Sequence, residues 1–110
     1  MRLLLDACVP RGFLGAIAQL APALTVAHTL DLGWGDLDDG PLLDRAASVC
    51  DVFITVDRKL PYQQRLAQRP FGVVVLRAAT NRIQELAPLV PALLAELPTV
   101  TPGSVRSVPV

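Results

Sequence analysis

Carboxylates at three points of the chain are the residues best suited to carry out chemistry. Asp6 and Asp57 each directly follow a short apolar run, and Asp39 lies before the second of these runs, with Asp38 beside it as an alternative. Clustered carboxylates repel one another unless a cation lies between them, and Mg²⁺ or Mn²⁺ takes oxygen ligands. We therefore expect Asp6, Asp39 and Asp57 to hold Mg²⁺ or Mn²⁺, which would activate water for phosphodiester hydrolysis.

Basic side chains follow the last of these acids. Residues 31–57 contain seven acids and one base, whereas residues 58–82 contain six bases and no acid. The totals of 10 basic and 10 acidic residues hide this division. A basic stretch beside an acidic one is expected where phosphates bind near a cation site, although two solvated faces would give the same pattern. The residues expected to bind nucleic acid are Arg58, Lys59, Arg65, Arg69 and Arg77.

Four apolar runs predict the strands that position the acids. They cover residues 3–5, 24–27, 52–56 and 73–76, and they are continuous rather than alternating. Continuous runs are typical of a parallel sheet that is covered on both faces. Between these runs, apolar residues recur at helical spacing. We therefore expect an α/β fold of three layers with a mostly parallel sheet of four or five strands.

Two helices are expected before the third run. Pro10 suits the first turn of one helix, which Pro22 then ends. The other has Pro41 in its first turn, and Asp38 and Asp39 are its candidate caps. If the strand order is second, first, third, fourth, the first and third strands are neighbours. Asp6 and Asp57 then share the rim where such sheets bind ligands.

The sequence of the C-terminal third predicts an interrupted helix, followed by a segment with two alternative structures. Apolar residues recur at helical spacing from Ile83 to Leu97, with Asn81 as the candidate cap. Two prolines within this stretch predict a kink or restart near Ala87. For residues 98–110 the sequence fits two alternatives, an edge strand or a loose tail.

Composition predicts one globular domain over residues 1–110, with a core of about 1–97 and a tail of 98–110. Hydrophobic residues make up 52% of the chain and charged residues 18%, which allows a compact core. Asp6 interrupts the apolar N-terminus too early for a secretion signal, and no apolar stretch is long enough to cross a bilayer. We expect a cytoplasmic protein without membrane contact. Cys8 and Cys50 lack the spacing of a zinc site and are expected to be buried free thiols.

Three segments together resemble a known family. They are Leu3-Leu4-Leu5-Asp6-Ala7-Cys8-Val9-Pro10-Arg11, the stretch from Leu32-Gly33-Trp34-Gly35 to Asp39-Gly40 and Leu42-Leu43, and Ile54-Thr55-Val56-Asp57-Arg58-Lys59 with Leu60-Pro61-Tyr62-Gln63-Gln64. In this order they resemble small PIN-like proteins of the DUF5615 type, relatives of VapC-like toxins. The resemblance implies a PIN-like fold, a metal-dependent ribonuclease acting on single-stranded RNA, and an antitoxin protein as partner. A homodimer is also left open. By position, Asp6, Asp39 and Asp57 match the acids of the pattern.

The chain departs from this pattern at Ala7, where relatives often carry a second acid, and no acid follows the fourth run. Two alternatives therefore stand beside the nuclease. One is a catalytically inactive PIN-like scaffold that binds a partner protein. The other is a receiver-like domain that accepts a phosphoryl group on Asp57, against which Ala7 and the lack of a late lysine count. His28 is interpreted as structural and Trp34 as a packing residue, while Tyr62 fits either contact with nucleic acid or a solvated helical turn.

Overall fold

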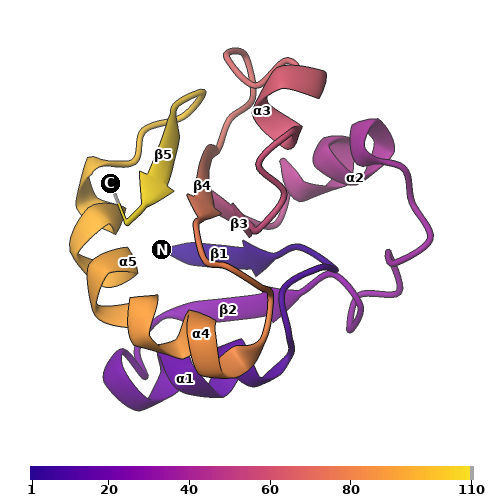
Figure 1. The fold of residues 1–110 in the computed structure, drawn as a ribbon. Coiled ribbons are helices and arrows are strands. Elements are labelled where there is room, and N and C mark those ends of the chain that lie inside the picture. Colours follow the sequence, from indigo (N-terminus) through magenta and orange to yellow (C-terminus); the bar gives the residue numbers. More distant parts are fainter. Residues whose placement is uncertain (110) are drawn as a thin grey trace.

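A five-stranded parallel sheet forms the centre of the fold (Figure 1). The structure is a computed structural model that describes residues 1–109, so Val110 at the end of the expected tail lies outside it. The strands are β1 (Arg2–Leu5), β2 (Thr25–His28), β3 (Val52–Thr55), β4 (Gly72–Leu76) and β5 (Val105–Val108). Their order is β2-β1-β3-β4-β5, and every neighbouring pair is parallel. The predicted parallel sheet is confirmed, and its first four strands have the order under which Asp6 and Asp57 share a rim.

Helices cover both faces of this sheet. They are α1 (Gly12–Leu20), α2 (Asp39–Ala46), α3 (Leu60–Gln63), α4 (Ile83–Leu86) and α5 (Val90–Glu96), with 3₁₀ turns η1 (Ala87–Leu89) and η2 (Leu97–Thr99). α1, α4 and α5 pack on the face that carries Leu5, Ile54 and Val74. α2 and α3 pack on the opposite face, against Leu4 and Phe53. The predicted three-layer α/β fold is confirmed, and it is consistent with a PIN-like arrangement.

The starts of α1 and α2 differ in detail from the predictions. α1 begins at Gly12, so Pro10 lies ahead of the first turn and instead accepts a backbone hydrogen bond from Phe13 at 3.0 Å. α1 ends at Leu20, before Pro22, as predicted. Asp38 takes the capping position of α2 with an extended backbone, but its side chain makes no capping hydrogen bond. The carboxylate of Asp38 therefore does not stabilise the helix by the predicted contact.

The predicted break in the C-terminal helix is confirmed. α4 ends at Leu86, the turn η1 follows, and α5 begins at Val90. Pro88 and Pro91 have no amide hydrogen for the helical ladder, which explains the break.

The predicted cap of α4 is wrong. The residue before α4 is Arg82, whose amide donates to Thr80 Oγ1 at 3.2 Å. Glu85 accepts a second hydrogen bond from the Thr80 amide at 2.9 Å. The side chain of Asn81 is turned away, because its amide donates to the Cys8 carbonyl at 3.1 Å. Asn81 thus ties α4 to the loop after β1.

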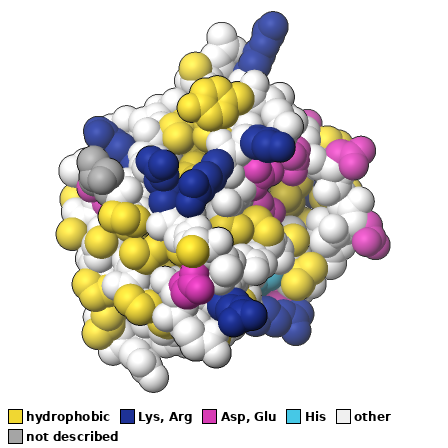
Figure 2. Space-filling model, in the orientation of Figure 1, with side chains coloured by type: hydrophobic (Ala, Val, Ile, Leu, Met, Phe, Trp, Pro, Cys, Tyr) yellow, Lys and Arg dark blue, Asp and Glu magenta, His cyan; other side chains and the backbone are white. Residues whose placement is uncertain are grey.

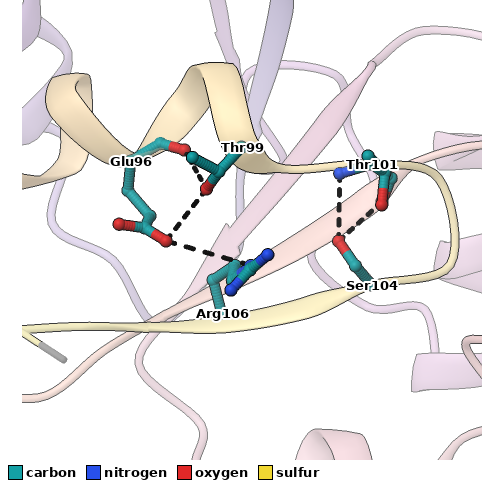
Figure 3. Close-up of polar contacts among 5 residues, drawn as sticks. All are labelled: Glu96, Thr99, Thr101, Ser104 and Arg106. Carbon is teal, nitrogen blue, oxygen red and sulfur yellow. Dashed lines mark hydrogen bonds and ion pairs between the residues drawn. The ribbon is translucent and has the colours of Figure 1, made fainter.

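The segment after α5 is an ordered edge strand. β5 pairs with β4 in parallel register, with Val74 opposite Arg106. Figure 3 shows the polar contacts that shape the turn and fix the strand: Arg106 Nε lies 3.8 Å from Glu96 Oε1, and Thr101 N donates to Ser104 Oγ at 3.0 Å. Thr99 Oγ1 donates to the Glu96 carbonyl at 2.8 Å. Of the two alternatives for this segment, the structure has the strand.

Two glycines let this segment approach the sheet closely. A Cβ on Gly72 would lie 2.2 Å from Val100 Cγ1 and 2.7 Å from the Thr101 carbonyl oxygen. Gly103 has φ +80°, and a Cβ there would lie 2.3 Å from the Ala67 carbonyl oxygen. Both positions exclude any larger residue unless the backbone moves.

Between residues 1 and 109, no helix is both long enough and apolar enough to span a membrane. Cys50 is a buried free thiol, as predicted, but Cys8 is only partly buried.

Candidate active site

The carboxyl ends of β1 and β3 place two of the predicted acids on one rim. Asp6 follows β1 directly, and Asp57 lies two residues beyond the last residue of β3. The strands are neighbours, with Leu5 opposite Ile54, and the Asp6 amide donates to the Ile54 carbonyl at 2.8 Å. The chain winds from β1 to β2 on one side and from β3 to β4 on the other. The rim between β1 and β3 is thus the switch point at which open α/β sheets bind ligands.

All three predicted catalytic acids line one cavity of about 380 Å³ at this rim. Asp39 reaches it from the start of α2, and Trp34 and Leu37 from the loop before α2 form part of the wall. Trp34 is half-buried, and the Arg45 guanidinium lies 5.9 Å from its ring centroid. Trp34 therefore packs, as interpreted, while it also shapes the cavity.

Asp6 is the buried member of the set, with 8% of its surface exposed. Its Oδ1 accepts the Ala7 amide at 2.8 Å, and its Oδ2 accepts the Thr55 hydroxyl at 2.7 Å and the Cys8 thiol at 3.4 Å. A carboxylate has about four lone-pair positions, so little capacity remains for another ligand. Asp6 is held in one orientation by the protein itself.

Thr55 links the two strand-end acids. Its hydroxyl donates to Asp6 Oδ2 and accepts the Asp57 amide at 3.0 Å. Asp57 Oδ1 in turn accepts the Lys59 amide at 2.9 Å, which leaves Oδ2 without a described protein donor. The backbone and Thr55 therefore fix Asp57 without neutralising its charge.

Sequence reasoning missed Thr55 and the place of Cys8. Thr55 is fully buried at the end of β3, a position where a polar side chain needs a partner. A polar residue within the otherwise apolar run of residues 52–56 was the available signal. Cys8 lines the cavity, and burial followed by the charge of Asp6 raises the pKa of its thiol. Cys8 is therefore a protonated thiol at neutral pH.

The surroundings of Asp39 in the cavity raise the pKa of its carboxyl group. Partial burial raises the pKa of its carboxyl, and the negative charges of Asp6, Asp57 and Asp38 raise that pKa further, in this order. No basic side chain in residues 1–109 forms an ion pair with Asp39. Asp38 itself is exposed and is not part of the cavity wall.

Removing the charge of Asp39 is expected to stabilise the metal-free protein at neutral pH. In the folded state the pKa of the Asp39 carboxyl lies above the 3.8 of an unperturbed aspartate. Ionisation therefore costs more in the folded than in the unfolded state, and this cost disappears as pH falls through the raised pKa toward 3.8. Asp39→Asn should raise Tm by roughly 1–4 °C at pH 7, as a fraction of a kcal/mol does in such a domain. Melting of both proteins in EDTA from pH 7 to pH 3 measures this, and a gain that persists at pH 3 would contradict the electrostatic cause.

The carboxylate oxygens of these acids are suitable ligands for a divalent cation, but the acids do not lie close enough together to surround one. Asp39 and the outer oxygen of Asp57 supply hard oxygen donors at a site with uncompensated negative charge. Within residues 1–109, however, no three Asp, Glu, His or Cys side chains lie close enough together to hold an ion. The free donors are thus those of Asp39 and Asp57, with Asp6 behind them as a buried anion.

The predicted phosphate-binding residues divide between two other hollows. Arg58 and Arg77 line a groove of about 290 Å³ beside β4 and β5. Arg65 and Arg69 line a second cavity of about 460 Å³, where Arg69 is paired with Asp44. Lys59 is exposed at the start of α3. These five residues therefore do not line one cavity, and none of them lines the acidic cavity.

His28 has a structural role, as predicted from the sequence. The ring is fully buried, Nε2 lies 2.6 Å from the Val9 carbonyl oxygen, and Nδ1 accepts the Leu30 amide at 3.1 Å. Both nitrogens are thus occupied away from the acidic cavity.

Searches of protein-family models, curated proteins and solved structures found no match to this chain.

Proposed function

We propose that this chain is an endoribonuclease that depends on Mg²⁺ or Mn²⁺, with Asp39 and Asp57 as ion ligands and Asp6 as the third, buried carboxylate. The observation that carries the proposal is the shared cavity of the three acids at the switch point of the sheet. Ligands bind at this position in doubly wound folds, and the pKa of Asp39 is raised first by burial and then by neighbouring negative charges that a cation would offset. A bound ion there would activate water and polarise a phosphodiester.

The protein's own part in this chemistry is to position the charges. Thr55 and two backbone amides fix the orientations of Asp6 and Asp57 before any ligand arrives. Arg58 follows Asp57 in the chain, so a polyanion held by this basic side chain would pass close to the acids. The sequence resemblance to PIN-like proteins supports RNA as that polyanion.

A non-catalytic scaffold is the second candidate. It is favoured by the three protein hydrogen bonds that Asp6 already accepts and by the lack of a closed ligand set in residues 1–109. In that case the acidic cavity would serve only for recognition of a partner protein.

Metal response and RNA cleavage separate the two candidates. Wild-type protein should melt at a higher temperature in Mg²⁺ or Mn²⁺ than in EDTA, because a ligand that binds only the folded state stabilises it. It should also cut a labelled single-stranded RNA in metal and not in EDTA. Asp39→Asn should lose both responses, since it removes an ion ligand. If neither metal changed Tm and no RNA were cut, the scaffold would replace the nuclease.

A further inference from the structure

A partly apolar groove lies over the last two strands, beside α3. Val75 of β4 and Val105 and Ser107 of β5 line it, and Val75 pairs with Ser107 in the sheet. Alternate residues of a strand share a face, so all three belong to the face on which α2 and α3 pack. Among the described residues, no part of β5 belongs to that core, and Val105 remains 41% exposed. The helices thus leave this end of the sheet face open.

Two arginines without acidic partners border this groove. Arg58 and Arg77 both line it, and neither forms an ion pair within residues 1–109. The Arg58 guanidinium is held by a hydrogen bond from Nη2 to the Ala78 carbonyl at 3.1 Å. The arginines that are paired lie elsewhere: Arg2, Arg11, Arg69 and Arg106. The groove therefore presents two arginines that form no ion pair with a described acid.

An exposed aromatic ring completes the groove. Tyr62 of α3 lines it and is 90% exposed, the highest value among the exposed large hydrophobic residues described. Figure 2 shows basic side chains around a hydrophobic group in front of β4 and β5, with acidic side chains beside them. An aromatic face next to unpaired arginines is the composition of sites for single-stranded nucleic acid, where bases stack and phosphates meet cations.

We propose that this groove binds one nucleotide of a single-stranded RNA, with the base on Tyr62 and the flanking phosphates on Arg58 and Arg77. The inference rests on the proposed function for the choice of RNA, and it adds a subsite that includes β5. A duplex keeps its bases stacked inside and cannot offer one to an exposed ring. Arg58 lies next to Asp57 in the chain, so a strand seated in the groove would lead toward the acidic cavity.

Binding measured in EDTA tests this subsite apart from cleavage. The probe is a fluorescein-labelled single-stranded RNA of ten nucleotides, with a base-free ribose phosphate oligomer of equal length for comparison. Tyr62→Ala should weaken RNA binding about tenfold, because stacking contributes that much per base, and should leave binding of the base-free oligomer unchanged. Tyr62→Phe keeps the ring and should bind as wild type does.

Salt dependence tests the arginines. Arg58→Ala and Arg77→Ala should each lower the slope of log affinity against log salt by about 0.7, the value for one phosphate of a single strand. Arg82→Ala removes an exposed arginine that forms no ion pair within residues 1–109 and does not line the groove, and it should leave the slope unchanged.

The outcomes distinguish the subsite from the proposed function. Binding that depends on Tyr62 without any cleavage in metal would sustain the subsite and refute the nuclease. Metal-dependent cleavage with equal RNA binding by wild type and Tyr62→Ala would overturn the subsite alone. Equal affinity of wild type for a duplex, or binding of an acidic peptide in place of RNA, would also overturn it.

Discussion

Asp57→Asn is expected to abolish the response to metal and to lower RNA cleavage by roughly 10²-fold or more, the loss that follows removal of one charge-stabilising group from an active site. The asparagine oxygen can still accept the Lys59 amide, and the hydrogen bond from the residue 57 amide to Thr55 does not involve the side chain. Shape is therefore kept while a ligand charge is lost. Cleavage rates and Tm values with and without Mn²⁺ measure the effect.

A control and a second readout separate lost chemistry from lost structure. Asp36→Asn removes an exposed acid that does not line the cavity and should retain full activity and metal response. In EDTA, Asp57→Asn should melt at or slightly above the wild-type temperature and should lower the pKa of Asp39, because the Asp57 charge helps to raise it. Wild-type cleavage by Asp57→Asn would remove Asp57 from the proposed site.

Gly72→Ala is expected to destabilise the fold strongly. The new Cβ would meet Val100 Cγ1 at 2.2 Å and the Thr101 carbonyl oxygen at 2.7 Å, distances that require the segment before β5 to move. Overpacking of this kind lowers the free energy of unfolding by about 1–3 kcal/mol. In a domain of this size that corresponds to a fall in Tm of roughly 5–20 °C.

Gly15→Ala is the matched control, because it makes the same chemical change inside α1. A Cβ there would meet nothing within 4 Å, and alanine favours the helix by roughly 0.5–1 kcal/mol. Gly15→Ala should therefore raise Tm slightly. An unchanged Tm in Gly72→Ala would mean that the segment before β5 does not pack on β4 in solution.

The fold could be predicted from local patterns because two of its central strands, β3 and β4, are fully buried. β3 and β4 are covered on both faces, so their apolar runs are continuous and their ends are marked by polar residues. The same patterns placed Asp6 and Asp57 on one rim, since all parallel strands point their carboxyl ends the same way. The cap of α4 was predicted wrongly because Asn81 has a partner, the Cys8 carbonyl, that lies 73 residues away in the chain.

The site could be predicted only as a set of acids near one rim. Their shared cavity depends on the start of α2 folding back over the ends of β1 and β3, and no local pattern encodes that approach. Likewise, the hydrogen bonds of Asp6 come partly from Thr55, 49 residues away. The sequence predicted that the basic residues form one binding surface. In the structure, Arg58 and Arg69 lie on either side of α3 in the chain and line different cavities.

The sequence by itself determined the parallel sheet and the rim on which Asp6 and Asp57 stand, because buried strands give continuous apolar runs and parallel strands end at the same edge. The order of the strands was settled by the structure. Only the tertiary structure decided that Asp39 rather than Asp38 lines the cavity with them, that residues 105–108 complete the sheet, and that Tyr62 shares a groove with Arg58 and Arg77. These depend on contacts between segments distant in the chain. Such contacts are set by packing and backbone clearance, as at Gly72, rather than by local periodicity.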